Sequence, residues 1–354
     1  MTAVVEPATP YLVVDVERLQ KNIARVASAA AEAGVVLRPH AKTHKTVEIA
    51  RMQLAAGAVG LTVATLGEAE VYVEHGVGDV FVAYPVWLDD DKARRLVALA
   101  DRARVTVGVD SVESAANLGR RAPGLAVLVE VDCGQHRTGV DPADAGEVAA
   151  AAERAGLDVR GVFTFPGHGY SPDGRRTAAE QEAAALAAAA ASLHAAGVEP
   201  RMLSGGSTPT LEASLTTGVP TELRPGVYAL NDAQQWELGS ATTDQIALTC
   251  QATVVSHAGG RLVLDAGGKA LAADRAAYNS GAARLLDDPG ARVVLLSEHH
   301  AVVEGYRGPP PPLGGRVRVV PNHVCAAVNL AETLWADTGD RLEPWTVAAR
   351  GRNW

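Results

Sequence analysis

The spacing of apolar and polar residues predicts two kinds of structure in this chain. From residue 35 to about residue 230, short β-branched runs alternate with alanine-rich amphipathic stretches, a pattern typical of strands joined by helices. Helices are expected, for example, at 46–56, 92–102 and 177–195. The predicted strands are VVLRPH (35–40), GLTVA (60–64), DVFVAYPV (79–86), VTVGVD (105–110), LAVLVEVD (125–132), DVRGVFTF (158–165), RMLSGG (201–206) and TELRPGVYAL (221–230).

Eight successive strand–helix units over roughly 200 residues predict an α/β fold with a (β/α)8 TIM-type barrel, because a right-handed crossover repeated eight times closes on itself. A doubly wound open sheet is the alternative fold. Such a sheet usually has fewer strands, and no G-x-G-x-x-G motif follows the first predicted strand. The barrel is therefore the favoured fold.

Beyond about residue 240 the pattern changes to strands separated by glycine and proline turns, in the segments IALTCQATVVS, GRLVLDAG, RVVLLSEHH, RVRVVPNHVC and PWTVAAR. These segments predict an all-β C-terminal domain. The run YLVVDV (11–16) precedes the long first helix and is not needed by a barrel, so we assign it to the β domain as well. The predicted domains are a barrel at 17–238 and a β domain at 239–354, joined by an N-terminal strand within 1–16.

Composition narrows the class of protein. The 354 residues are 47% hydrophobic and 21% charged, as in soluble globular proteins. The net charge of −9 comes without a basic cluster, which argues against nucleic-acid binding. No apolar run is long enough for a membrane span, and the start of the chain lacks the pattern of a secretion signal. With only three scattered cysteines, we expect a cytoplasmic protein without a disulfide framework.

Polar residues follow several predicted strands at their C-terminal ends, where barrels of this kind hold their active sites. RPHAKTHK follows the first strand and places His40, Lys42, His44 and Lys45 at the rim. DCGQHRTG follows the fifth strand and contributes Arg137, and FPGHGY ends the sixth with His168 and Tyr170. Each of these residues alone would most often be a solvated or packing residue. Their position at the same end of several strands favours one shared site.

The seventh and eighth strands end in motifs suited to a phosphate. In SGGSTPT, Gly206 lets the backbone approach closely, and Ser207 and Thr208 offer hydroxyls beside a predicted helix start. RPGVY adds Gly226 and Tyr228 from the eighth strand. Barrels commonly bind phosphate with these two loops. A lysine on the first strand then faces the aldehyde of a phosphorylated cofactor.

In the β domain, PNHVC places His323 and Cys325 two residues apart at the end of an extended run. Residues at i and i+2 of a strand point to the same face, so an imidazole and a thiolate could bind one metal ion. Nitrogen and sulfur ligands favour zinc, with manganese and magnesium as alternatives. Two protein ligands leave positions for water or a substrate hydroxyl, as in a catalytic site.

Five motifs together, RPHAKTHK, DCGQHRTGV, SGGSTPT, ELRPGVY and PNHVC, resemble the fold-type III pyridoxal phosphate (PLP) enzymes of the D-serine dehydratase and D-threonine aldolase family. The resemblance runs from TPYLVVD to WTVAARGR. It implies that Lys42 forms the Schiff base with PLP, with Lys45 as second choice. It also implies that Arg137 lies near the phenolic oxygen of PLP and that His323 and Cys325 hold the divalent metal.

The resemblance implies a lyase that acts on small D-3-hydroxy amino acids, in a homodimer. The H-x-C pair is similar to the dehydratase branch, which yields an oxo acid and ammonia from D-serine or D-3-hydroxyaspartate. His168 resembles the aldolase pattern, in which a D-threonine aldolase-type reaction yields glycine and an aldehyde. An amino-acid racemase and a non-enzymatic PLP carrier are further alternatives, since barrel and β domain also resemble alanine racemase, and PLP carriers are single barrels.

Overall fold

The computed structural model describes residues 7–354, which form two compact units. The barrel unit comprises Val26–Lys42, Ala50–Gly226 and Arg352–Trp354. The sheet unit comprises the chain up to Arg25 together with Thr43–Ile49 and Val227–Gly351. The chain thus passes from the barrel unit into the sheet unit between Lys42 and Thr43. The domain limits expected at residues 17 and 238 stay a prediction, because compactness does not decide which segments fold independently.

The barrel unit is built on eight parallel strands in the order β2-β9-β8-β7-β6-β5-β4-β3. A parallel bridge between His40 and Thr62 joins the end of β2 to β3, so that the two edges of the sheet meet. The predicted TIM-type barrel is therefore confirmed. Its strands are β2 Val36–Leu37, β3 Leu61–Val63, β4 Asp79–Pro85, β5 Arg104–Val109, β6 Ala126–Glu130, β7 Asp158–Phe163, β8 Met202–Gly205 and β9 Glu222–Leu223.

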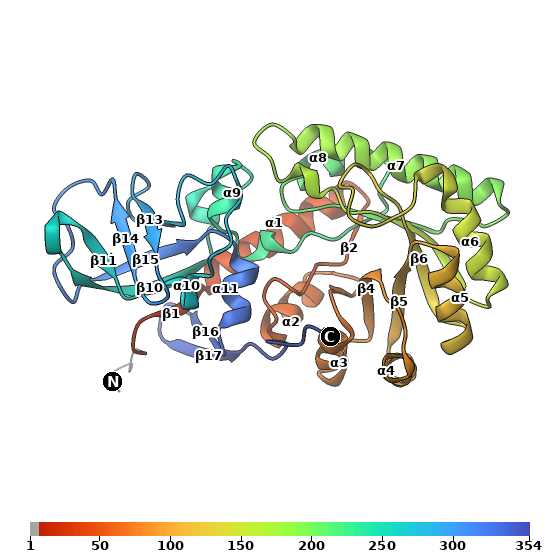
Figure 1. Cartoon of the computed structure of the whole chain (residues 1–354), viewed down its shortest axis with the longest axis horizontal. Helices are drawn as coiled ribbons and strands as arrows, with labels where there is room; N and C mark the ends of the chain where they lie inside the picture. The colour runs from red at the N-terminus through yellow and green to blue at the C-terminus, as the bar shows by residue number, and fades with distance from the viewer. Residues whose placement is uncertain (1–6) are drawn as a thin grey trace. The chain divides into compact units, whose positions relative to one another are not determined.

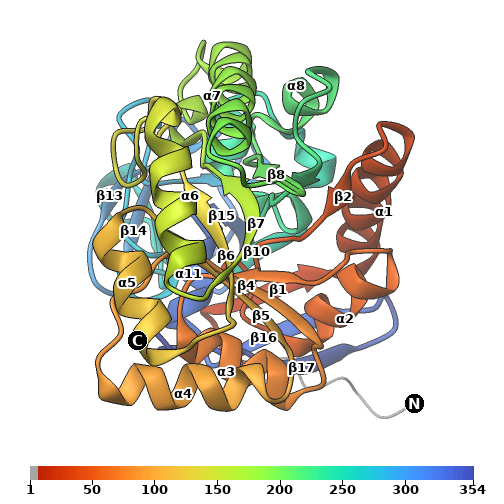
Figure 2. The ribbon, with the colours of Figure 1, turned by 90° about the vertical axis from the view of Figure 1, so that its right-hand side faces the viewer.

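Helices of the barrel unit lie outside its strands, as Figure 2 shows for α4 to α7. The alanine-rich α7 is the longest, in keeping with the high helix propensity of alanine. These elements are α3 Leu66–Glu74, α4 Asp90–Ala100, α5 Val112–Arg121, η1 Pro142–Asp144, α6 Ala145–Arg154, η2 Gly167–Gly169, α7 Arg175–Ala195 and α8 Leu211–Thr216. Two more helices, α1 Val16–Glu32 and α2 Val47–Ala55, contribute residues to both units. No helix among residues 7–354 is long and apolar enough to cross a membrane.

The interior of the barrel is filled by side chains. Phe81 and Phe163 meet edge to face with ring centroids 5.0 Å apart, and Leu128 packs with them. The guanidinium carbon of Arg224 lies 5.5 and 5.3 Å from the two ring centroids. Gly108 is required here, because a Cβ at that position would lie 2.7 Å from Phe163. The barrel is thus a packed core, and any ligand site must lie at its ends.

The sheet unit contains nine strands, in the order β11-β14-β13-β12-β15-β10-β1-β16-β17. An additional β10–β11 pairing closes the first six strands into a ring. Figure 1 shows β10, β13, β14 and β15 close together. The strands are β1 Tyr11–Asp15, β10 Leu248–Ser256, β11 Leu262–Leu264, β12 Ala283–Leu285, β13 Arg292–Leu296, β14 Ala301–Glu304, β15 Arg316–Pro321, β16 Thr333–Asp337 and β17 Leu342–Thr346.

Short helices accompany this sheet, namely η3 Val227–Ala229, α9 Ala233–Glu237, η4 Thr243–Gln245, η5 Ala258–Gly260, α10 Gly268–Leu271 and α11 Val324–Leu330. The expectation of one strand over 221–230 is wrong beyond Leu223, because the chain turns into η3 there. Tyr228 lies in η3 and is 2% exposed.

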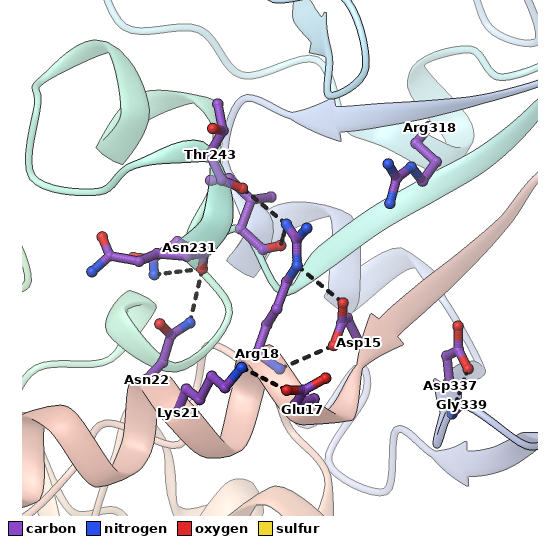
Figure 3. A network of polar contacts seen from close by, with 12 residues as sticks. Asp15, Glu17, Arg18, Lys21, Asn22, Asn231, Thr243, Arg318, Asp337 and Gly339 are labelled. Atoms are coloured by element: carbon purple, nitrogen blue, oxygen red, sulfur yellow. Dashed lines mark hydrogen bonds and ion pairs between the residues drawn. The ribbon is translucent and has the colours of Figure 1, made fainter.

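The first turns of α1 are fastened to the sheet unit by polar contacts (Figure 3). Arg18 forms an ion pair with Asp15 at 3.0 Å and donates to the carbonyl of Thr243 at 2.9 Å. The amide of Asn22 donates to the carbonyls of Ala229 and Gln245 at 3.0 and 2.8 Å. These bonds explain why α1 belongs to the sheet unit up to Arg25.

Candidate active site

Lys42 and Arg137 meet the same aromatic ring at the C-terminal end of the barrel. The ammonium nitrogen of Lys42 lies 5.8 Å from the ring centroid of Phe165, and the guanidinium carbon of Arg137 lies 5.2 Å from it. Lys42 follows β2, Arg137 follows β6, and Phe165 follows β7. Because all eight strands are parallel, these three residues lie at one rim of the barrel. The half-buried Lys42 is thereby held over an apolar surface.

The Gly206–Thr208 turn lies at the same rim, directly after β8. Gly206 has a φ of +85°, and a Cβ there would lie 2.8 Å from Leu223. Ser207 and Thr208 are buried. The following helix α8 has only six residues, so its dipole adds little to an anion site, and the predicted helix-start contribution is smaller than expected. The close packing around Gly206 leaves no room for a side chain at this position of the turn.

His168 and Tyr170 lie in and just after η2, beyond β7. The ring centroids of Tyr170 and Phe165 are 6.5 Å apart. Nε2 of His168 lies 2.9 Å from Oε1 of Gln181, while its buried Nδ1 has no hydrogen-bond partner among residues 7–354. If Nε2 carries the proton that Gln181 accepts, Nδ1 keeps a lone pair, which suits a proton acceptor.

His40 is the bridge partner of Thr62, so it lies where the two edges of the barrel join. Gly226 lies three residues after β9 and ends the segment Ala50–Gly226 of the barrel unit. Both therefore lie at the same rim as Lys42. Tyr228 belongs to the sheet unit with His323 and Cys325.

Lys45, the second candidate for the cofactor amine, is engaged elsewhere. It is buried, has a φ of +54°, and donates through Nζ to Oδ1 of Asn329 at 2.8 Å. Its carbonyl accepts from the amide of Ala349 at 3.1 Å. These bonds within the sheet unit give Lys45 a structural role, which favours Lys42 as the cofactor lysine.

The predicted metal pair interacts, but not through strand geometry. β15 ends at Pro321, His323 occupies the N-cap position of α11, and Cys325 lies in the first turn of that helix, so the expectation of an extended segment is wrong. Nδ1 of His323 bonds Oδ2 of Asp274, and Sγ of Cys325 lies 3.2 Å from Oγ1 of Thr43. Against the effect of burial, the negative charge of Cys325 and the hydrogen bond to Asp274 raise the pKa of His323 to about 11.

Asp232 fixes the start of the helix that bears this pair. The carboxylate is fully buried and accepts from the amides of Val324 at 3.0 Å and Gln235 at 2.9 Å. Burial raises the pKa of Asp232 to about 6. No group of three or more His, Cys, Asp or Glu side chains in the described part of the chain could hold a metal. Imidazole and thiol groups in contact fit a divalent ion that completes its coordination with water or substrate.

Sequence reasoning missed Asp232 and two further buried carboxyl groups beside the site. Glu130, the last residue of β6, accepts from Oγ1 of Thr138 at 2.8 Å, and its Oε2 has no partner among the described residues. Burial raises the pKa of Glu130. Glu182 of α7 bonds the Gly206 turn. An acidic residue ending a core strand was a usable signal for Glu130, whereas nothing in the sequence of α7 separates Glu182 from its exposed neighbours.

Comparison with known proteins finds the same two-part organisation, with one family match for the barrel region and another for the sheet region. Residues 14–233 match the family described as alanine racemase, N-terminal domain, and residues 247–336 match a putative serine dehydratase domain. The D-threo-3-hydroxyaspartate dehydratase of Delftia sp. is 35% identical over 95% of this chain and 98% of its own. The D-threonine aldolase of Arthrobacter sp. is 32% identical over 97% and 93%. A cysteine-to-alanine mutant of D-threo-3-hydroxyaspartate dehydratase, solved in the metal-free form, has a TM-score of 0.89 at 32% identity and covers 98% of each chain.

Proposed function

Because this chain belongs to the alanine racemase-like, fold-type III family of PLP enzymes, we propose that it is a lyase that dehydrates D-3-hydroxy amino acids. The convergence of Lys42 and Arg137 on Phe165, at the rim that bears the Gly206 turn, carries the proposal. The relatives that match nearly the whole chain are dehydratases and aldolases of such substrates. D-Serine and D-3-hydroxyaspartate are the proposed substrates, with a 2-oxo acid and ammonia as products.

PLP, when bound, supplies a ring that stabilises negative charge at the substrate Cα, and a divalent metal supplies a Lewis acid for the 3-hydroxyl. We assign the cofactor aldehyde to the amine of Lys42 and its phosphate to the Gly206–Thr208 turn. Gly226, Tyr228, His40 and Tyr170 are proposed to complete the cofactor site.

In the proposed reaction, the residues of the chain bind the two groups and move a proton. Lys42, once free of the cofactor, would accept the proton from Cα. Arg137 provides positive charge for the phenolic oxygen of the cofactor. His323 and Cys325 would hold the metal, for which zinc is our first choice.

Retro-aldol cleavage is the second candidate function, and His168 is the observation in its favour. A buried Nδ1 without a hydrogen-bond partner among residues 7–354 suits the acceptor of a proton from the substrate's 3-hydroxyl. Cleavage of the Cα–Cβ bond would then give glycine and an aldehyde. Cys325 favours dehydration, because it gives this chain the H-x-C pair of the dehydratase branch.

A product assay with D-serine, D-threonine and D-3-hydroxyaspartate, with PLP and zinc present, distinguishes the candidates. We expect a 2-oxo acid and ammonia in equal amounts. Glycine and an aldehyde would instead identify an aldolase, and inversion at Cα that survives chelation would identify a racemase. Borohydride reduction followed by peptide mapping should find the cofactor on Lys42, and a label on Lys45 would overturn that assignment.

We further propose a cytoplasmic homodimer. The thiols of Cys133, Cys250 and Cys325 form no disulfide, which suits a reducing compartment. Sedimentation of the purified protein tests the dimer, and a monomer at micromolar concentration would refute it.

A further inference from the structure

A buried carboxyl group lies behind the turn to which the cofactor's phosphate is assigned. Glu182, in the middle of α7, has no exposed surface. Its Oε1 accepts from the amide of Gly206 at 2.5 Å, and its Oε2 accepts from the hydroxyl of Ser214 at 2.7 Å. Gly206 lies in the first part of the turn, and Ser214 lies on α8 after it. One side chain therefore holds both ends of the segment.

The turn has a second internal bond. The amide of Ser207 donates to Oγ1 of Thr210 at 3.1 Å, and the two hydroxyl oxygens are 2.9 Å apart. Two successive amides, at Gly206 and Ser207, are thus bonded from within the barrel unit. The shape of the turn is accordingly supported by Glu182 and Thr210, and Glu182 links the turn to α7.

Gly205 shows how closely the carboxyl group approaches the backbone. A Cβ at Gly205 would lie 2.3 Å from Oε1 of Glu182. Any other residue at this position would push the carboxyl group away from the amide of Gly206. The two glycines are therefore required for different reasons: Gly206 because its φ is positive, and Gly205 because the carboxyl group of Glu182 lies so close to it.

We propose that Glu182 is a positioning residue that holds the Gly205–Thr208 turn in the shape that receives the phosphate of PLP. This inference rests on the proposed function, which assigns the phosphate to that turn. Glu182 acts through the backbone amide of Gly206 and does not itself touch the cofactor.

The charge of Glu182 is compatible with a neighbouring anion. Burial raises the pKa of Glu182 to about 7, although the bonds from Gly206 and Ser214 and the charge of Arg224 oppose the rise. A proton is therefore available to this carboxyl group near neutral pH. A protonated Glu182 still accepts from Gly206 through Oε1, so the turn keeps its bond when a phosphate dianion binds.

The test compares a ligand that carries the phosphate with one that lacks it. Dissociation constants of PLP and of pyridoxal are measured by absorbance titration of the wild type and of Glu182→Ala, Glu182→Gln and Glu180→Ala. We expect Glu182→Ala to weaken PLP binding by about 10- to 100-fold, as for a lost buried hydrogen-bond acceptor, and to change pyridoxal binding less than about twofold. Glu182→Gln keeps the acceptor for Gly206 and should restore most of the PLP affinity.

Glu180→Ala is the matched control, because Glu180 lies on the same helix with an exposed side chain. This variant should bind both ligands as the wild type does. If Glu182→Ala weakens the binding of PLP and of pyridoxal equally, the proposal is overturned, because a general distortion of the site affects ligands with and without a phosphate alike. If Glu182→Ala does not fold, Ser214→Ala replaces it, with a selective loss of about 3- to 10-fold in PLP affinity expected and an unchanged affinity refuting the proposal. A wild type that binds PLP no better than pyridoxal would instead refute the phosphate site itself.

Discussion

Replacing Glu182 by glutamine should change how the stability of the protein depends on pH. The pKa of Glu182 is raised by burial from 4.5 to about 7 in the folded protein. Between these two values the folded chain holds a proton that the unfolded chain has lost. The free energy of unfolding therefore falls as pH rises from about 4.5 through about 7. This direction is opposite to that of a salt-bridged carboxylate.

The size of the effect follows from the two pKa values. The rise of the pKa from 4.5 to about 7 corresponds to about 3 kcal/mol when the group is ionised in both states, and most of it develops between about pH 5 and about pH 8. Glutamine has the same shape, keeps the acceptor for Gly206 and does not titrate. Its side-chain amide can donate to the oxygen of Ser214, which then accepts instead of donating.

The assay is urea unfolding of the protein without cofactor at several pH values, for the wild type, Glu182→Gln and Glu180→Gln. The free energy of unfolding of Glu182→Gln minus that of the wild type should grow by about 2–3 kcal/mol as pH rises over this range. The difference for Glu180→Gln, an exposed site, should stay constant. Parallel curves for Glu182→Gln and the wild type would refute the reasoning, because the charge of Arg224, which opposes the effect of burial, would then have kept the pKa of Glu182 ordinary.

Three further substitutions test the geometry of the site. Asp274→Asn should weaken zinc binding by about 10- to 100-fold in a chelator competition, because Asp274 orients His323, and an unchanged affinity would contradict that role. Gly206→Ala should destabilise the protein by at least about 1–2 kcal/mol more than Gly218→Ala in urea unfolding, since both glycines have positive φ but only Gly206 faces a close neighbour; equal losses would exclude that contact. Phe165→Leu should weaken PLP binding about two- to fivefold, because it removes about 0.5–1 kcal/mol of cation–π contact that holds the guanidinium of Arg137, and an unaffected dissociation constant would rule this out.

The barrel could be predicted because each of its strands carries its own signal. All eight strands of the barrel lie within or next to the predicted segments, since buried parallel strands are continuous β-branched runs. The strands of the sheet unit are harder to predict from the sequence, and β12, β14 and β16 lie outside the predicted segments. These strands have only three to five residues, and they are fixed by pairing with distant segments, such as β12 with β15.

The site was predictable where a residue follows directly from the end of a strand, and unpredictable where a helix intervenes. Lys42, Arg137 and Gly206 follow strands of one parallel sheet, so their shared rim was a consequence of topology. His323 and Cys325 were paired for the wrong reason, because the chain after Pro321 turns into α11 rather than continuing the strand.

The residues that sequence reasoning missed share a physical property. Glu182, Glu130 and Asp232 are carboxyl groups that hold backbone or side-chain donors inside the protein, and burial raises the pKa of each. Their role is defined by which amide or hydroxyl they reach, for example Val324 for Asp232, and that partner lies far away in the sequence. A charged residue in the interior is costly unless it is bonded, so each of these groups marks a place where the fold fixes a loop or a helix start. Two of the three lie behind the segments assigned here to the phosphate and to the metal. This arrangement is expected if both sites are held rigid before their ligands bind.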